Sequence, residues 1–359
     1  MLGGNDIVFL LGAGASKEAG LLTAEDMVGE IENRIKEDAP WTKYRDLYFY
    51  MKSALLYADG IKGADGGFGR FNIERLVNAM RELEKNESHT IYPFVGAWNM
   101  KLTLLAGNDF KQLREFRQQI VRELITKWVN LRIHQDADYY AGLVNFQEQW
   151  TYPVPVFSLN YDMCVEAACK GRCRLERGFS DDDSRRWTWQ RFEDWSEIQA
   201  QIYLYKMHGS LDWRRDAQKN LTFEDSPAPP DEFEELEMIF GTDYKLSYID
   251  PYLYFVYSFR KFTLEAKLLI CMGYGFSDEH INGILRQAMQ QDTEKLLLAV
   301  TYTAEDNGGK KEAEKVARLL DIPSDRIRVE CRGAKAFLKE TLSKQYIESL
   351  APERTNEPF

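Results

Sequence analysis

The sequence predicts an α/β fold with an open parallel sheet and a large helical insertion. Short runs that are apolar throughout recur along the chain, which is typical of strands covered on both faces. Several of these runs are followed by helix-like stretches, as in folds that alternate strands and helices. The predicted strands cover residues 7–11, 154–159, 202–207, 268–272, 296–301 and 327–330, and the predicted helices include 280–290 and 334–342.

A long block between the first and second strands is predicted to be mostly helical. Its clearest helix has apolar residues three or four apart with charges between them: Leu113, Phe116, Ile120, Leu124 and Trp128. We therefore divide the chain into a sheet domain (1–23 and 151–345), an inserted helical subdomain (24–150) and a tail (346–359). The aromatic residues of the insertion, such as Trp41 and Tyr48, are expected to pack in its own core, with an assembly surface as the alternative.

Composition limits the class of protein. The 359 residues carry a net charge of -11 and are 44% hydrophobic. This acidity argues against binding to bare nucleic acid, because phosphate affinity comes mainly from clustered Lys and Arg. No apolar run is long enough to span a bilayer, and the first residues do not resemble a signal peptide. The five irregularly spaced cysteines suit reduced thiols, so we expect a cytoplasmic protein.

A glycine loop follows the first strand. The stretch GAGAS places Gly12, Ala13, Gly14 and Ser16 directly after it. Small residues let the backbone approach a phosphate, and a following helix would direct N–H groups and a partial positive charge at the same place. The stretch matches neither the Walker A loop nor the G-x-G-x-x-G fingerprint. A tight turn without a ligand remains the alternative.

Three further strand ends carry polar or glycine clusters. The motif FSLNYD places Asn160 and Asp162 after the second strand, and HGS places His208 after another. The motif GYGFSD follows the strand at 268–272 and contains Gly273, Tyr274, Gly275 and Ser277. In open α/β sheets ligands bind outside the carboxyl ends of the strands. We therefore expect these clusters to converge on one site.

The ordered motifs GAGAS, SLNYD, HGS and GYGFSD resemble the Sir2 (sirtuin) superfamily, and more closely its SIR2-like branch in bacterial anti-phage defence. The resemblance covers residues 7–20 and roughly 154–342, and it implies a Rossmann-like parallel sheet that binds NAD as a substrate. The predicted NAD-binding residues are Gly12, Ala13, Gly14, Ser16, Asn160, Asp162, Gly273, Tyr274, Gly275 and Ser277. The predicted catalytic residues are Asn160, His208 and Asp162, with His208 as general base.

Two departures from sirtuin deacetylases bear on the substrate. Leu22, Thr23, Ala24 and Glu25 stand where deacetylases have a Pro-Asp-Phe-Arg segment. The cluster Cys164, Cys169 and Cys173 lacks the paired Cys-x-x-Cys spacing of a structural zinc site, so no metal is expected. The absence of that zinc module weakens the case for an acyl-lysine substrate.

The resemblance and these departures favour an NAD glycohydrolase that releases nicotinamide and ADP-ribose. The alternatives are an NAD-dependent protein deacylase or ADP-ribosyltransferase, and a non-catalytic module that senses NAD or ADP-ribose. Likeness to the defence branch implies an abortive-infection effector that is restrained by homo-oligomerisation or by a partner such as a HerA-type ATPase. No direct nucleic-acid or membrane binding is expected.

Overall fold

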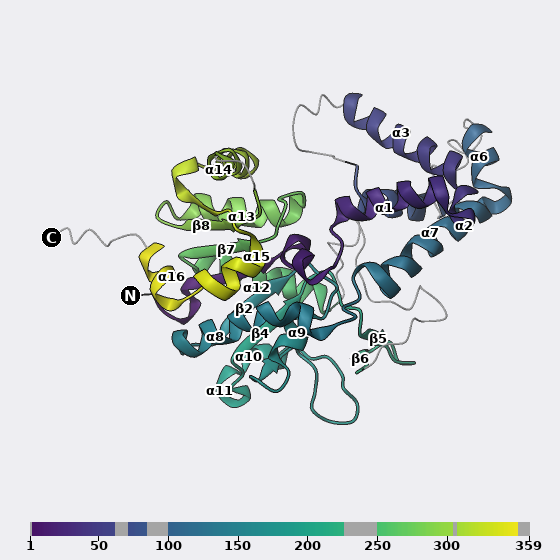
Figure 1. Cartoon of the computed structure of the whole chain (residues 1–359). Helices are drawn as coiled ribbons and strands as arrows, with labels where there is room; N and C mark the ends of the chain where they lie inside the picture. Colours follow the sequence, from purple (N-terminus) through teal and green to yellow (C-terminus); the bar gives the residue numbers. More distant parts are fainter. Residues whose placement is uncertain (1, 62–70, 85–99, 226–249, 304–306, 351–359) are drawn as a thin grey trace. The chain divides into compact units, whose positions relative to one another are not determined.

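The computed structural model describes residues 2–61, 71–84, 100–225, 250–303 and 307–350. The chain divides into two compact units. Among the described residues, the first unit comprises 2–21, 131–225, 250–303 and 307–350, and the second comprises 22–61, 71–84 and 100–130. Both units are drawn in Figure 1.

A seven-stranded parallel sheet forms the centre of the first unit. Its strands are β1 (Ile7–Leu11), β2 (Val154–Ser158), β3 (Leu175–Glu176), β4 (Ile202–Lys206), β7 (Leu268–Met272), β8 (Leu296–Val300) and β9 (Ile327–Glu330). Their order in the sheet is β3-β4-β2-β1-β7-β8-β9. Without the short edge strand β3, this is the strand order of a Rossmann fold, and the order reverses between β1 and β7. The predicted fold class and the six predicted strands are confirmed.

Helices pack on both faces of the sheet (Figure 1). The helices of this unit are α8 (Ala141–Trp150), α9 (Cys164–Cys169), α10 (Gln190–Glu193), α11 (Trp195–Ile198), α12 (Tyr252–Glu265), α13 (Glu279–Gln291), α14 (Gly308–Leu320), α15 (Gly333–Ala336) and α16 (Lys344–Leu350). The predicted helix at 280–290 is α13. The predicted helix at 334–342 is α15, continued by a π-helical turn over Phe337–Thr341.

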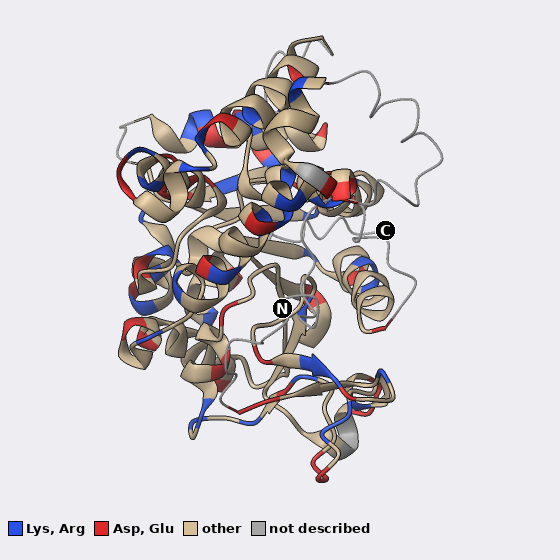
Figure 2. Cartoon of the chain, turned by 90° about the vertical axis from the view of Figure 1, so that its right-hand side faces the viewer, with Lys and Arg blue, Asp and Glu red and all other residues tan. Residues whose placement is uncertain are grey.

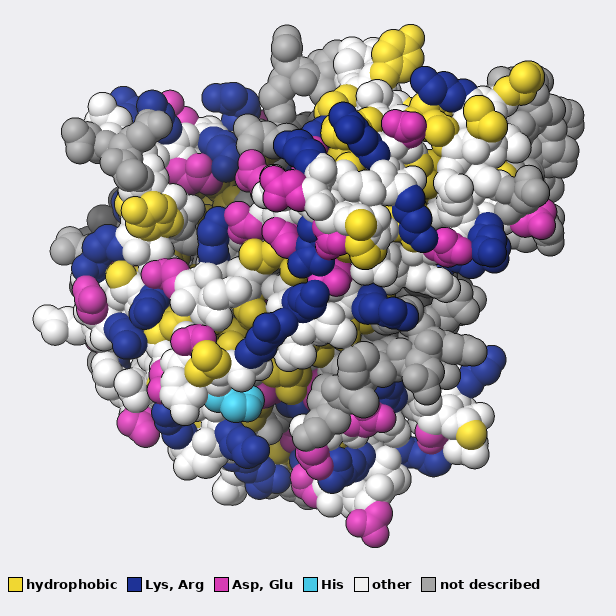
Figure 3. All heavy atoms as spheres, turned by 45° about the vertical axis from the view of Figure 1, so that its right-hand side comes forward, with side chains coloured by type: hydrophobic (Ala, Val, Ile, Leu, Met, Phe, Trp, Pro, Cys, Tyr) yellow, Lys and Arg dark blue, Asp and Glu magenta, His cyan; other side chains and the backbone are white. Residues whose placement is uncertain are grey.

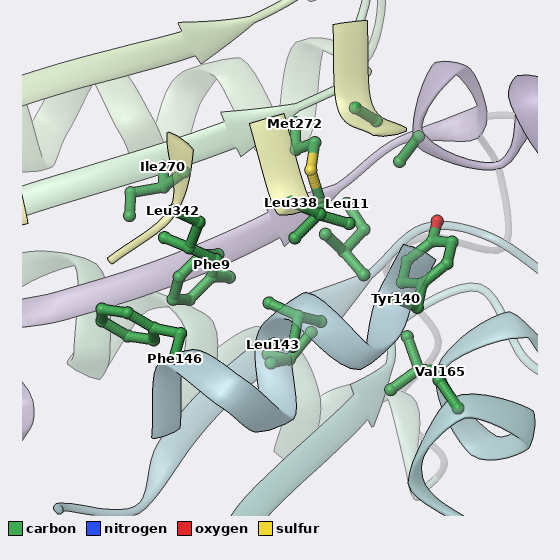
Figure 4. Packing of buried hydrophobic residues seen from close by; sticks show 14 of the residues in the cluster. Phe9, Leu11, Tyr140, Leu143, Phe146, Val165, Ile270, Met272, Leu338 and Leu342 are labelled. Atoms are coloured by element: carbon green, nitrogen blue, oxygen red, sulfur yellow. The ribbon is translucent and has the colours of Figure 1, made fainter. Parts of the chain in front are cut away.

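One face of the sheet carries an aliphatic and aromatic core. Phe9 of β1 and Ile270 of β7 point toward α8 and the C-terminal segment, where Leu143, Phe146 and Leu342 meet them (Figure 4). The rings of Phe9 and Phe146 lie edge to face, with centroids 5.7 Å apart. This packing explains why α8 and the preceding turn belong to the sheet unit, although the sequence boundary at residue 150 placed them in the insertion. Helical periodicity predicts a buried face but not the element that covers it.

The other face is more aromatic. Phe157 of β2 stacks on Tyr205 of β4, with ring centroids 4.4 Å apart, and lies 5.0 Å from Phe259 of α12. A two-stranded antiparallel hairpin, β5 (Trp213–Arg215) and β6 (Leu221–Phe223), follows β4. The acidic composition of 221–243 predicts a solvated loop or lid. This prediction is wrong for Leu221–Phe223, which pair with β5, and residues 226–243 lie outside the described part of the chain.

The second unit is helical, as predicted for most of the insertion. Its helices are α1 (Ala24–Glu37), α2 (Ala39–Thr42), α3 (Arg45–Ile61), α4 (Ile73–Glu84), α6 (Met100–Ala106) and α7 (Lys111–Glu123), and a π-helical turn over Leu124–Trp128 continues α7. Phe116 of α7 stacks on Tyr44 at 4.6 Å and meets Trp41 edge to face at 6.1 Å. Trp41, Tyr44 and Tyr48 are buried, so these aromatic residues pack within the unit.

Charged residues of both signs occur together on most helices (Figure 2). On the face drawn in Figure 3, basic and acidic side chains are likewise interspersed. The net charge of -11 is thus not gathered into a single acidic surface among the described residues of that face.

Candidate functional site

The first and fifth strands of the main sheet end in loops that touch backbone to backbone. The N–H of Gly12, directly after β1, donates to the carbonyl of Met272 at 2.9 Å. The N–H of Gly14 donates to the carbonyl of Gly273, directly after β7, also at 2.9 Å. A Cβ on Gly273 would lie 1.9 Å from the Ala15 nitrogen. Only glycine allows these loops to meet where the strand order reverses.

Replacing Gly273 with alanine is expected to destabilise the protein by about 2 kcal/mol, because φ is +61° and the new methyl group would overlap Ala15. Gly283 of α13 provides a matched control, since nothing lies within 4 Å of its Cβ position. Gly283→Ala should leave the free energy of unfolding unchanged or raise it. Urea unfolding measures both; equal effects of the two substitutions would contradict the proposed close contact.

The glycine loop does not lead directly into a long helix. It forms two 3₁₀ turns, Ala13–Ala15 and Lys17–Ala19, and then Gly20 in the left-handed region at φ 81°. The helix expected immediately after the loop is therefore replaced by short turns, and α1 begins only at Ala24. The backbone of the loop, rather than a helix terminus, is the feature that could approach a phosphate.

Asn160 lies two residues beyond β2 and is only 6% exposed. Its Nδ2 donates to the Gly12 carbonyl at 3.0 Å and to Ser16 Oγ at 3.2 Å. These two bonds hold the amide against the glycine loop. Its Oδ1 is buried and has no hydrogen-bond partner in the described chain. A buried unpaired acceptor is costly, so this oxygen marks a position where a bound molecule can donate a hydrogen bond.

Asp162 stabilises the loop that carries Asn160. Its Oδ1 accepts the N–H of Cys164 at 3.0 Å, at the first residue of α9. Burial raises the pKa of Cys164, and the nearby carboxylate raises it further, so the thiol stays protonated. The Asp162 carboxylate thus fixes the turn that carries Asn160.

His208 lies just beyond β4 and is 5% exposed. Its Nε2 is 3.6 Å from Oδ2 of Asp278, which is also buried. Asp278 caps α13, since Oδ1 accepts the N–H groups of His280 at 3.0 Å and Ile281 at 3.4 Å. The His208 side chain therefore reaches the end of the GYGFSD loop.

The Asn160 and His208 loops are also joined to each other. The N–H of Leu211 donates to the carbonyl of Tyr161 at 3.1 Å, and the Tyr161 and His208 rings have centroids 6.4 Å apart. Through these contacts the structure brings together all four sequence motifs at the carboxyl edge of the sheet.

Of the other residues predicted to bind NAD, some are buried and some are exposed to solvent. Tyr274 is buried; its hydroxyl lies 2.9 Å from Asn282 Oδ1 and 3.1 Å from the Asp278 carbonyl, so the phenol supports its own loop. Ala13, Gly275 and Ser277 are exposed. These three positions are the ones that leave backbone and hydroxyl groups accessible to a ligand.

Part of the chain that contains this site matches a known family model. Residues 155–322 match the model of the SIR2-like domain. Over this stretch, a little under half of the chain, the protein is similar to the SIR2-like domain family. The matched stretch begins in β2 and ends beyond α14, and it contains the Asn160, His208 and Gly273 motifs.

Solved Sir2 structures resemble this chain weakly. A mutant Sir2 homologue complex with 2′-O-acetyl ADP ribose has a TM-score of 0.43 and 12% identity, covering 97% of this chain and 94% of that one. A Sir2 homolog–NAD complex has a TM-score of 0.44 and 12% identity, covering 96% and 90%. A mutant Sir2 homologue complex with ADP ribose has 0.42 and 10%, covering 96% and 92%. No curated protein matches the chain.

A buried group of charges lies under the Asn160 and His208 loops. Lys206, 2% exposed, donates to the Asp162 carbonyl and lies 3.7 Å from Glu166 Oε1. Arg177 pairs with Asp212 at 2.5 Å and lies 3.7 Å from Glu166. Burial raises the pKa of Glu166 despite both cations. We call Lys206, Glu166, Arg177 and Asp212 the buried charge cluster.

Sequence reasoning missed this cluster. Lys206 ends the apolar strand IYLYK, and a charge in such a run was the available signal. A second contact was also missed: Glu18 Oε2 accepts the N–H of Lys335 at 2.8 Å, which ties the glycine loop to α15 beside Gly333.

Metal-ligand groups and membrane-spanning helices are both absent from the described residues. Within the described ranges, no group of three or more His, Cys, Asp or Glu side chains is placed to hold a metal ion. All five cysteines are free. No helix in the described parts of the chain is long and apolar enough to cross a bilayer.

Proposed function

We propose that this protein binds NAD at the carboxyl edge of its sheet and hydrolyses the bond between nicotinamide and ribose. The observation that carries the proposal is the Asn160 carboxamide. Its oxygen is a buried, unpaired acceptor held at the point where the strand order reverses, which is where dinucleotides bind in open α/β sheets. The Sir2 homolog–NAD complex, among the similar structures, agrees with a dinucleotide ligand.

The loops offer suitable groups for the rest of the dinucleotide. The accessible positions Ala13, Gly275 and Ser277 would hold the pyrophosphate and the adenosine ribose. Nothing lies within 4 Å of the Cβ position of Gly275, so a ligand can approach its backbone closely. Hydrogen bonds to phosphate need no lysine here, because backbone N–H groups of a tight turn bind anions.

Asn160 and His208 would carry the chemistry. Nicotinamide leaves as a neutral base, so its departure needs no proton, but positive charge develops on the ribose. Asn160 Oδ1 would accept a hydrogen bond from a ribose hydroxyl or from the attacking water and so fix its position. His208 would take the proton from that water, and Asp278 would orient the imidazole and stabilise its protonated form. Asp162 would act through the loop, not on the substrate.

Replacing His208 with alanine is expected to reduce nicotinamide release about 10²-fold, because a general base is lost while the binding loops remain. The assay incubates purified protein with NAD and follows nicotinamide, ADP-ribose and cyclic ADP-ribose by liquid chromatography. His134→Ala is the control, because His134 is exposed and precedes the turn before α8. Equal turnover by the His208 and His134 variants would contradict the assigned role.

The same assay separates the alternatives. Nicotinamide release that requires an acylated peptide would identify a deacylase, and transfer of ADP-ribose to protein would identify a transferase. Tight binding of NAD without any product would identify a sensing module. Hydrolysis by the protein in the absence of a peptide supports the proposal.

We place this activity in anti-phage defence by abortive infection, on the strength of the motif resemblance. Destruction of NAD would have to be restrained before infection, by homo-oligomerisation or by a partner such as a HerA-type ATPase. Exposed apolar side chains on α3 and α6 of the helical unit support an assembly surface, among them Tyr57, Ile61, Met100 and Leu104. Light scattering with and without a co-expressed ATPase, combined with the NAD assay, tests this regulation.

A further inference from the structure

The hydroxyl of Ser16 lies at the centre of a buried hydrogen-bond network. Its Oγ accepts Nδ2 of Asn160 at 3.2 Å and lies 2.9 Å from the hydroxyl of Tyr140. Ser16 is 1% exposed and Tyr140 is equally buried. Figure 4 shows Tyr140, on the turn before α8, with its hydroxyl at the end of the packed core.

The donors and acceptors around Asn160 can be assigned by counting. Asn160 has two amide hydrogens, and both are used, one on the Gly12 carbonyl and one on Ser16 Oγ. In the bond with Asn160, Ser16 Oγ is therefore the acceptor.

The remaining bond of the network joins Ser16 to Tyr140. Ser16 Oγ has two lone pairs, and one of them is taken by the Asn160 amide. The Tyr140 hydroxyl lies 2.9 Å from Ser16 Oγ, and either hydroxyl can be the donor in this bond. Burial raises the pKa of Tyr140 well above its ordinary value, so the phenol stays protonated.

We propose that Tyr140 is a positioning residue which, through Ser16, fixes the Asn160 amide so that it presents only an acceptor to the substrate. The inference rests on the proposed function of this site. Because both amide hydrogens are held by the protein, the group that meets Oδ1 has to be a donor, either a ribose hydroxyl or the attacking water. Ser16, which we predicted to contact the cofactor, acts in this arrangement as the relay between Tyr140 and Asn160.

Tyr139 provides a matched control. It is the neighbouring residue, is equally buried, and its hydroxyl also reaches the glycine loop, where it donates to the Ala15 carbonyl at 2.6 Å. Tyr139→Phe and Tyr140→Phe each remove one oxygen atom and one buried hydrogen bond. Only the Tyr140 hydroxyl contacts the hydroxyl that holds Asn160.

The test is a double-mutant cycle on nicotinamide release, with folding checked by circular dichroism and thermal melts. Tyr140→Phe should lower kcat about tenfold and change KM less than threefold, because loss of one hydrogen bond loosens the Asn160 amide. Ser16→Ala should lower kcat by at least as much. Adding Tyr140→Phe to Ser16→Ala should then cost less than twofold, since the relay is already missing.

The outcomes distinguish the inference from the proposed function. Equal kcat losses caused by Tyr140→Phe in the wild-type and Ser16→Ala backgrounds would overturn the inference. So would a kcat for Tyr140→Phe equal to that of Tyr139→Phe. If the wild-type protein binds NAD without releasing nicotinamide, hydrolysis is wrong, and calorimetry tests the inference instead: Tyr140→Phe should weaken NAD binding about threefold in the wild-type background and not in Ser16→Ala. An unchanged affinity, or no binding of NAD at all, would overturn it.

Discussion

Asn160→Ala is expected to reduce nicotinamide release about 10³-fold while KM for NAD changes only a fewfold. The substitution removes the acceptor that positions the reacting hydroxyl, and groups that act mainly in the transition state affect kcat more than KM. Asn160→Asp should not restore activity. It keeps an acceptor, but a carboxylate cannot donate to the Gly12 carbonyl or Ser16 Oγ, so the side chain loses its anchors. Steady-state kinetics with both variants measure these effects.

Asn5→Ala is the control for this prediction. Asn5 is exposed and precedes β1, at the opposite edge of the sheet from the candidate site. Its replacement should leave kcat and KM unchanged. Retention of more than a tenth of the wild-type kcat by Asn160→Ala would remove Asn160 from the proposed mechanism.

Lys206→Met is expected to lower the free energy of unfolding by about 3 kcal/mol at neutral pH. Removing one member of a buried ion pair leaves the other charge unpaired in a medium of low polarity. Here the substitution leaves the Asp162 carbonyl without its ammonium donor and deprives Glu166 of one of two cations. Because the same ammonium supports the turn that carries Asn160, kcat should also fall. Urea unfolding monitored by circular dichroism measures the stability.

The loss of stability caused by Lys206→Met should depend on pH. The folded-state pKa of Glu166 is already raised by burial, and removal of Lys206 raises it further. Below the ordinary carboxyl range Glu166 is protonated in both the folded and unfolded states, so the penalty for an unpaired charge is absent. The penalty grows as the pH rises from the unfolded-state pKa to the folded-state pKa, and it is fully present above the folded-state pKa. The stability difference between wild type and Lys206→Met should therefore be larger at pH 8 than at pH 5.

Lys267→Met provides the control. The Lys267 ammonium lies 2.9 Å from Asp6, but its side chain is 41% exposed. A surface ion pair of this kind contributes about 1 kcal/mol or less. If Lys267→Met and Lys206→Met destabilised the protein equally, burial of the charge cluster would not be the cause.

The sheet could be predicted from the sequence because its strands are buried on both faces. In β1, β7 and β8 every residue is apolar, so few other structures could be assigned to them. The predicted motifs also lie at one edge of the sheet, since parallel strands carry their ends to the same side. Asn160, His208 and Gly273 are therefore placed together by topology alone.

The contacts within the site could not be predicted from the same patterns. Tyr140 stands in a helical stretch, and its spacing shows only that it is buried. That its hydroxyl meets Ser16, 124 residues away in the sequence, depends on how α8 and its preceding turn pack on the sheet. The roles of Lys206 and Asp212 depend in the same way on tertiary packing, because ion pairing is set by three-dimensional distance and not by spacing along the chain.

The parallel sheet has a consequence for synthesis of the protein. Asn160 is anchored to Gly12, which was made 148 residues earlier, and the glycine loop is closed by Gly273, which comes later still. A chain that emerges from the ribosome from its N-terminus cannot complete this arrangement until the strand before Gly273 has been translated and inserted beside β1. If the protein hydrolyses NAD as we propose, newly made, partial chains would be unable to consume the dinucleotide pool of the cell that is making them.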